Sequence, residues 1–168
     1  LGGLGLHAVQ IAKLSGAFVY GVDTREESLK AAENFGADVV LDPKKRDIYA
    51  SIQKETMGRG VDLVFEGVGV EETFPQALSC LRKGGTLVLT GYDPLHSLPL
   101  DSFGMHYNEW SVHGTRLGTK NELLQLIEFV REGKLKPVLS KTYPFTEANT
   151  ALEELKSGKI VGRIVLTM

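Results

Sequence analysis

The chain begins with glycines whose spacing suits the binding of a phosphate group. The first residues read LGGLGLHAVQIAK, so glycines at positions 2, 3 and 5 directly precede a segment with apolar residues at helical spacing. A glycine turn that opens a helix points backbone N–H groups and the positive end of the helix dipole at an anion. Gly2 lets the backbone approach a phosphate, and Gly5 lets the helix pack against a sheet. These residues predict a phosphate-binding turn.

A carboxylate follows at the distance that a dinucleotide-binding unit requires. Asp23 ends the apolar run AFVYGVD, about 20 residues after the glycines. A carboxylate at this strand end accepts hydrogen bonds from ribose hydroxyl groups and repels the 2′-phosphate of NADP. Arg25 offers a nearby positive charge that could bind a 2′-phosphate, so NADP stays open as the less favoured cofactor. We therefore predict binding of NAD in preference to NADP.

Helical and strand-like segments alternate up to Gly91, as the positioning of such a site requires. The strand-like segments are uninterrupted apolar runs, which suit a parallel sheet covered on both faces. The expected fold class is α/β, with a doubly wound parallel sheet of the Rossmann type. Strands are expected in residues 17–23, 37–42, 61–69 and 86–91, and helices in residues 3–15, 24–36, 46–58 and 73–85.

The helix expected over residues 73–85 carries its own boundary signals. Thr73 and Gln76 have the spacing of a capping box. The paired glycines at 84 and 85 are expected to end the helix. Cys80 would then lie in the middle of the helix beside leucines, as a packed core thiol.

The pattern changes after Gly91. Residues 92–108 read as a long irregular segment, and residues 109–118 as a last strand with a loop. Thr119 and Glu122 have capping-box spacing at the start of a helix that Gly133 ends. A strand, a helix and a strand are then expected in residues 139–145, 146–158 and 163–168.

Composition excludes several classes of protein. The chain has 168 residues, 42% of them hydrophobic and 24% charged, with a net charge of −2 and no basic stripe, which argues against a nucleic-acid surface. No apolar run reaches the roughly 20 residues that span a bilayer, so no membrane partner is expected. A single cysteine excludes an internal disulfide and favours a reducing compartment, hence a cytoplasmic location.

Five segments together resemble the medium-chain dehydrogenase/reductase family, and within it the zinc-type alcohol dehydrogenases. In chain order they are GGLGLHAVQIAK, GADVVLD, GVDLVFEGVG, ALSCLRKGGTLVLTG and GKLKPVLSKTYPFTEANTALEELKSGKIVGRIVL. The resemblance implies an NAD(P)-binding Rossmann domain over residues 1–133 and a segment over residues 134–168 that returns to the catalytic domain. It also implies that the first strand of the sheet and most of the catalytic domain precede this chain.

The resemblance assigns roles to residues at the ends of the expected strands. It places the pyrophosphate on the glycine turn, the adenosine ribose on Asp23, the adenine side on residues 67–69, the nicotinamide ribose on residues 90–92, and the carboxamide on backbone groups of residues 115 and 117. The cofactor-binding set is Gly2, Gly3, Leu4, Gly5, Asp23, Arg25, Gly67, Val68, Gly69, Thr90, Gly91, Tyr92, Thr115 and Leu117.

The activity implied by the resemblance is NAD-dependent hydride transfer between a small alcohol or carbonyl compound and the nicotinamide. The catalytic zinc and its ligands would lie in the preceding domain, so this chain is expected to carry no catalytic or metal-binding residue and to be inactive alone. The strand near residues 109–114 resembles the edge through which family members form homo-oligomers. Alternatives are a zinc-free quinone or enoyl reductase, a methyltransferase, and a non-enzymatic NAD-sensing module.

Two further residues invite a functional interpretation. His7 lies in the first helical turn after the glycines, where a phosphate contact is conceivable but a helix-surface or interface position is favoured. Asp62 and Glu66 share one face of a strand but lie about 13 Å apart, too far for an acid–base pair. Glu66 is therefore interpreted as structural or as part of the cofactor rim.

Overall fold

The computed structural model describes residues 1–168 as two compact units. The first comprises Leu1–Asp42 with Thr119–Met168, and the second comprises Pro43–Gly118. Every strand pair in both units is parallel, which confirms the predicted α/β class. None of the helices is long and apolar enough to cross a membrane.

The N-terminal part of the first unit alternates helices and short strands. Its elements are α1 (Gly5–Leu14), β1 (Tyr20–Val22), α2 (Glu26–Asn34) and β2 (Val39–Leu41), and β1 pairs with β2. Leu6 of α1, Ala32 of α2 and Val138 form one buried cluster. The core therefore joins the glycine-turn helix to a residue from the C-terminal part of the chain.

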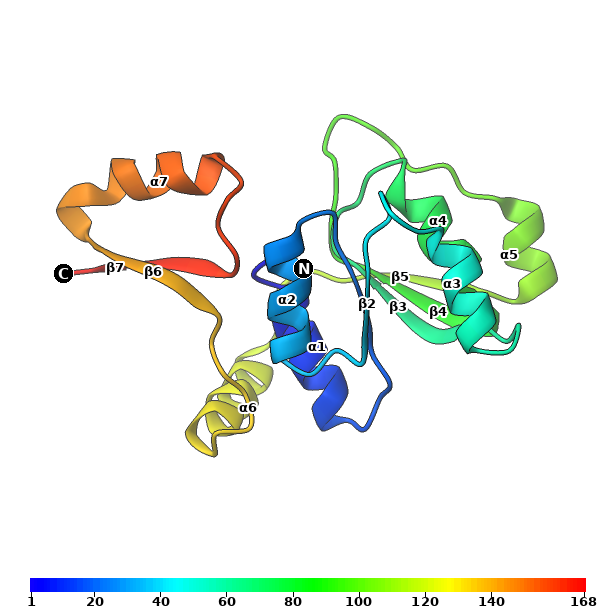
Figure 1. Ribbon diagram of the computed structural model, residues 1–168, viewed down its shortest axis with the longest axis horizontal. Coiled ribbons are helices and arrows are strands. Elements are labelled where there is room, and N and C mark those ends of the chain that lie inside the picture. The colour runs from blue at the N-terminus through cyan, green and yellow to red at the C-terminus, as the bar shows by residue number, and fades with distance from the viewer. The chain divides into compact units, whose positions relative to one another are not determined.

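The C-terminal part of the first unit follows the sequence prediction closely. It contains α6 (Lys120–Arg131), β6 (Leu139–Pro144), a 3₁₀ turn (Phe145–Glu147), α7 (Ala148–Lys156) and β7 (Arg163–Thr167). The capping box at the start of α6 is present, with both reciprocal hydrogen bonds between Thr119 and Glu122. Figure 1 shows α7 beside the parallel pair of β6 and β7, with which it is in contact.

The elements of the second unit are α3 (Ile48–Glu55), β3 (Val61–Glu66), α4 (Thr73–Ser79), β4 (Leu81–Leu89), α5 (Ser102–Asn108) and β5 (Ser111–Gly114). Its strands form a three-stranded sheet in the order β3-β4-β5. Phe74 and Leu78 of α4 pack against Leu81 and Leu87 of β4, and Trp110 packs at the margin of this cluster. Figure 1 shows α3 and α4 side by side next to the sheet, in agreement with their contacts.

The prediction of one helix over residues 73–85 was wrong in its second half. Helix α4 ends at Ser79, and the paired glycines lie inside β4. Val61 pairs with Leu81 but Leu63 pairs with Thr86, so the glycines form part of a bulge that takes up the extra residues of β4. Cys80 is buried as expected, but at the end of the helix rather than in its middle.

The proposed capping box of α4 was also wrong. The residue before the helix, Glu72, makes no side-chain cap. The hydroxyl group of Thr73 instead donates a hydrogen bond to Oε1 of Glu66, 2.8 Å away. Thr73 and Gln76 have the spacing of a capping box, but the Thr73 hydroxyl group binds the buried carboxylate of Glu66 at the end of β3 instead of capping the helix.

The segment 92–108, expected to be irregular throughout, contains helix α5. Gly104 in the middle of this helix lowers its helix propensity, which concealed it in the sequence. A Cβ atom on Gly104 would lie 2.4 Å from Oδ2 of Asp101 and 3.2 Å from the ring of Trp110. Glycine is thus required by packing that the sequence pattern does not reveal.

Candidate cofactor-binding site

The glycine turn leads directly into α1, as predicted. The carbonyl oxygen of Gly2 accepts a hydrogen bond from the N–H of Leu6, and that of Leu4 accepts one from the N–H of Ala8, 2.9 Å away. A Cβ atom on Gly2 would meet no atom within 4 Å, and Leu4 is exposed. The outer surface of the turn is therefore open, which suits the approach of a phosphate group.

Arg163, the first residue of β7, lies against this turn and was missed by sequence reasoning. A Cβ atom on Gly3 would lie only 2.3 Å from Nε and 2.6 Å from Cζ of Arg163. The guanidinium group thus occupies the space above Gly3 that any other residue would fill. Spacing in the sequence gave no signal, because Arg163 reaches the turn only through the packing of β7.

Asp23 lies at the end of β1, close to the glycine turn. Its Oδ1 atom accepts a hydrogen bond from the N–H of Arg25 at 2.9 Å, and its Oδ2 atom lies 2.6 Å from the backbone nitrogen of Leu1. Burial raises the pKa of Asp23, and the hydrogen bond from the N–H of Arg25 lowers it. An ionised carboxylate has further lone pairs that can accept ribose hydroxyl groups.

Arg25 is held by the loop that precedes β7. Its Nη1 atom donates hydrogen bonds to the carbonyl oxygens of Gly158, at 2.7 Å, and Ile160, at 3.1 Å. Its Nε atom lies 3.6 Å from Oδ1 of Asp23. The guanidinium group is therefore engaged by backbone carbonyls and by the same carboxylate that is expected to bind ribose.

In the second unit, two of the predicted loops pack backbone against backbone. Gly69, with a φ of +75°, could not carry a Cβ atom, because that atom would lie 2.2 Å from the carbonyl carbon of Gly91. A Cβ atom on Gly91 would in turn lie 2.4 Å from backbone atoms of Val68. The structure thus brings the loop after β3, residues 67–69, together with the loop after β4, residues 90–92.

Glu66 organises both loops. Its buried carboxylate accepts hydrogen bonds from the N–H groups of Val68 and Gly69, the latter at 2.7 Å, and from the hydroxyl group of Thr73. Its carbonyl oxygen accepts the N–H and the hydroxyl group of Thr90, at 2.8 and 3.0 Å. These contacts give Glu66 a structural role, which is one of the two roles expected for it.

The remaining predicted residues, Tyr92, Thr115 and Leu117, follow the carboxyl ends of β4 and β5. The side chains of Tyr92 and Leu117 are largely exposed, and Leu117 has a left-handed backbone with a φ of +58°. The N–H of Thr115 donates a hydrogen bond to the carbonyl oxygen of Leu89 at 3.1 Å. Only the carbonyl group of the Thr115 backbone therefore remains for the predicted contact with a carboxamide.

Within these 168 residues, no group of three His, Cys, Asp or Glu side chains could hold a metal ion. The residues of this chain therefore do not fit a zinc site. A zinc ion bound by a longer protein would need ligands from other residues.

Comparison with known proteins identifies the family. The family model for zinc-binding dehydrogenases matches residues 3–132. This chain is a member of the zinc-binding dehydrogenase family. The match confirms the resemblance to the zinc-type dehydrogenases seen in the sequence.

Individual relatives match almost all residues of this chain. An NAD-dependent alcohol dehydrogenase of Sulfolobus acidocaldarius is 41% identical over 168 residues, which cover 98% of this chain and 47% of that protein. Crystallised alcohol dehydrogenase from Aeropyrum pernix is 34% identical, with a TM-score of 0.90 over 99% of this chain and 48% of that one. Acetophenone reductase from Geotrichum candidum, solved in complex with NAD, is 32% identical, with a TM-score of 0.82 over 100% of this chain and 46% of that one. This chain spans about half the length of these relatives.

Proposed function

We propose that this chain binds NAD and forms the cofactor-binding half of a dehydrogenase. The observation that carries the proposal is the position of Asp23 directly after β1, where its Oδ2 atom lies 2.6 Å from the backbone nitrogen of Leu1 at the start of the glycine turn. A carboxylate acceptor beside a phosphate-binding turn suits the ribose and the diphosphate of one dinucleotide. The name of the Sulfolobus acidocaldarius relative, an NAD-dependent alcohol dehydrogenase, supports the same cofactor.

Each part of the site has a distinct task under this proposal. The turn at Gly2 and the start of α1 bind the diphosphate, and the Arg163 guanidinium group beside Gly3 supplies a positive charge to it. Asp23 accepts the hydroxyl groups of the adenosine ribose. Residues 67–69 line the adenine side and residues 90–92 the nicotinamide ribose, and Glu66 fixes both loops. When bound, NAD supplies the nicotinamide that accepts or donates a hydride.

The contacts of Arg25 support NAD over NADP. The positive charge that could compensate a 2′-phosphate already binds the carbonyl oxygens of Gly158 and Ile160. Accepting a 2′-phosphate would require Arg25 to leave these carbonyls and the ligand to approach the Asp23 carboxylate. Both requirements oppose the binding of NADP.

For the full-length protein, we propose hydride transfer between a small alcohol and its carbonyl product, with a catalytic zinc held outside this chain. We also propose a homo-oligomer that forms through β5, which is an edge strand of the three-stranded sheet in the second unit. A cytoplasmic location remains our expectation. These proposals rest on the family to which the chain belongs.

The test is turnover by the full-length protein with NAD and a panel of primary, secondary and polyhydric alcohols. We expect NADH to form with at least one alcohol, and a zinc chelator to abolish turnover while NADH binding persists. Turnover that survives complete removal of zinc would instead support a zinc-free reductase. NADH binding without turnover of any alcohol or carbonyl compound would support an NAD-sensing module.

A further inference from the structure

The imidazole of His7 bridges two segments that lie far apart in the sequence. Its Nδ1 atom is 2.6 Å from the carbonyl oxygen of Gly3, and its Nε2 atom is 3.3 Å from the backbone nitrogen of Val138. A carbonyl oxygen can only accept a hydrogen bond, and a backbone N–H can only donate one. These partners call for Nδ1 as the donor and Nε2 as the acceptor. The sequence placed His7 on the helix surface or at an interface, and the structure shows a part-buried bridge.

Val138 in turn fixes the start of β7. Its carbonyl oxygen accepts a hydrogen bond from the N–H of Arg163 at 2.9 Å. A Cβ atom on Gly162, which has a φ of +95°, would lie 2.4 Å from the same oxygen. Only glycine permits this approach, so the position of Val138 determines where the Arg163 backbone lies.

The guanidinium group of Arg163 completes a closed set of contacts. It lies over Gly3, whose carbonyl oxygen is the atom that His7 binds. The contacts thus run from Gly3 through His7 and Val138 to Arg163 and back to Gly3. Because three of the four links are hydrogen bonds to backbone atoms, a shift at any one of them moves the guanidinium group relative to the turn.

We propose that His7 is a positioning residue for the diphosphate of the dinucleotide. It fixes the Gly3 carbonyl group and, through Val138, holds the Arg163 guanidinium group at the glycine turn. This inference rests on the proposed function, because it assigns to the turn the diphosphate that the dehydrogenase would bind. The ligand class is any nucleoside diphosphate with a second sugar, for which ADP-ribose is a probe without redox chemistry.

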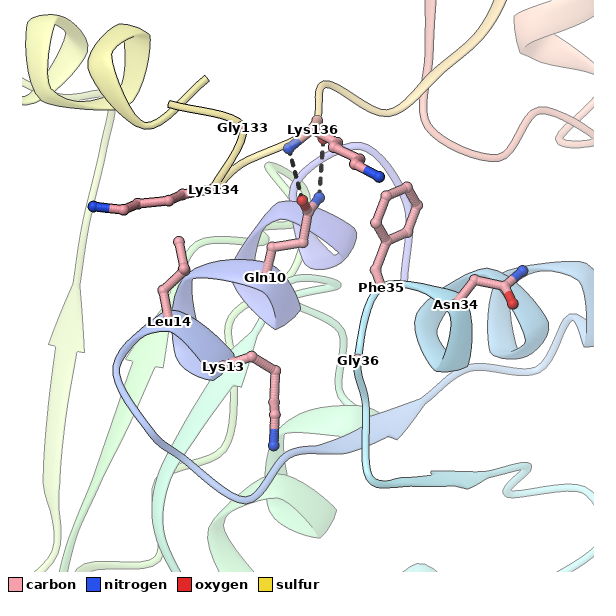
Figure 2. Close-up of a pocket in the computed structure, with 9 residues that line it drawn as sticks. All are labelled: Gln10, Lys13, Leu14, Asn34, Phe35, Gly36, Gly133, Lys134 and Lys136. Atoms are coloured by element: carbon pink, nitrogen blue, oxygen red, sulfur yellow. Dashed lines mark hydrogen bonds between the residues drawn. The ribbon is translucent and has the colours of Figure 1, made fainter. Parts of the chain in front are cut away.

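Gln10 provides a matched control on the same helix face. Its side-chain amide donates a hydrogen bond to the carbonyl oxygen of Lys136 at 3.0 Å and accepts one from the N–H of Lys136 at 2.8 Å. Figure 2 shows both bonds between Gln10 and the backbone of the segment that leads to Val138. Gln10 therefore ties α1 to the same segment as His7 does, but has no hydrogen bond to the glycine turn or Arg163.

The experiment is calorimetric titration of the full-length protein with ADP-ribose. His7→Ala is expected to weaken binding roughly tenfold, the scale of one displaced hydrogen bond to a charged group. Gln10→Ala should leave the affinity within about twofold of the wild type. Arg163→Gln should weaken binding by at least as much as His7→Ala. The double variant should bind about as Arg163→Gln does, because His7 acts on the ligand through Arg163.

His7→Gln places an amide where Nε2 accepts the hydrogen bond from Val138. This variant should therefore recover most of the affinity that His7→Ala loses. It also replaces His7→Ala as the test if that variant does not fold. Three results would each overturn the inference and leave the proposed function intact. They are wild-type affinity in His7→Ala, an equally large loss of affinity in Gln10→Ala, and multiplying losses in the double variant of His7→Ala and Arg163→Gln. A wild-type protein that does not bind ADP-ribose would overturn the proposed function, and the inference with it.

Discussion

At the scale of single residues, the first unit places opposite charges at distinct points of one small region. The Asp23 carboxylate is mostly buried and bound by two donors, whereas the Arg163 guanidinium group covers Gly3. A carboxylate suits hydroxyl groups and a guanidinium group suits phosphates. Under the proposed function, this separation of charge would favour a dinucleotide whose ribose carries no phosphate.

Replacing Asp23 by glycine tests the charge argument. Asp23→Gly removes the acceptor for the ribose hydroxyl groups and the repulsion of a 2′-phosphate. We expect NADH binding to weaken by roughly tenfold, the scale of one or two hydrogen bonds to a charged group, and NADPH binding to improve relative to it. Fluorescence titration with both cofactors measures the ratio. Asp38→Asn, which alters an exposed carboxylate paired with Lys13, should leave the ratio unchanged, and an unchanged ratio in Asp23→Gly would refute the assignment.

Asp62 provides a pH-dependent test of stability outside the site. Hydrogen bonds from the Arg59 and Arg82 guanidinium groups lower the pKa of Asp62 from 3.8 to about 2. Because the pKa is lower in the folded state, the ion pairs stabilise the protein above about pH 4, and this contribution is lost as the pH falls toward 2. The carboxylate is 60% exposed, so the contribution is at most about 1 kcal/mol. Asp62→Asn should therefore make the decrease in Tm between about pH 4 and 2 shallower, as followed by circular dichroism, and an identical decrease would contradict this prediction.

At the scale of elements, the ends of β3 and β4 are joined by backbone contact rather than by side chains. Glu66 binds both loops through its carboxylate and its carbonyl oxygen, and glycines at 69 and 91 let the two backbones meet. Backbone contact thus holds the two loops in place, and no side chain at position 69 or 91 occupies space between them.

Gly91→Ala tests this junction. The added methyl group would lie 2.4 Å from backbone atoms of Val68, so the loops must separate. We expect a loss of about 1–3 kcal/mol in the free energy of unfolding and weaker NADH binding, measured by urea denaturation and fluorescence titration. Gly114→Ala at the end of β5 is the control, since its Cβ atom would meet nothing within 4 Å. Equal stability of the two variants would contradict the junction described for residues 67–69 and 90–92.

Elements that carry a local sequence signal could be predicted, whereas contacts between distant segments could not. The glycine turn, the Asp23 strand end and the α6 capping box are local signals, and the structure has each where the pattern placed it. The end of α4 was mispredicted because a glycine pair marks a helix end and a strand bulge equally well. Arg163 and the His7 bridge were missed because they depend on contacts between the two ends of the chain, which no periodicity records.

At the scale of the whole molecule, this chain belongs to the zinc-binding dehydrogenase family and spans about half the length of its relatives. We propose that its residues bind and orient a dinucleotide, and no group of three of its His, Cys, Asp or Glu side chains could hold a metal ion. The proposed division of labour gives cofactor choice to Asp23 and its neighbours, and gives the chemistry of the alcohol to the rest of the protein. Cofactor preference is therefore the property that this chain determines most directly.

The decisive measurement is a parallel titration of the full-length wild-type protein with NADH and NADPH. The account predicts saturable binding of NADH with an affinity at least about tenfold higher than that for NADPH, a difference of roughly 1.4 kcal/mol. Absence of NADH binding, or a preference for NADPH, would contradict the role assigned to Asp23 and the proposal that this chain is the NAD-binding half of a dehydrogenase.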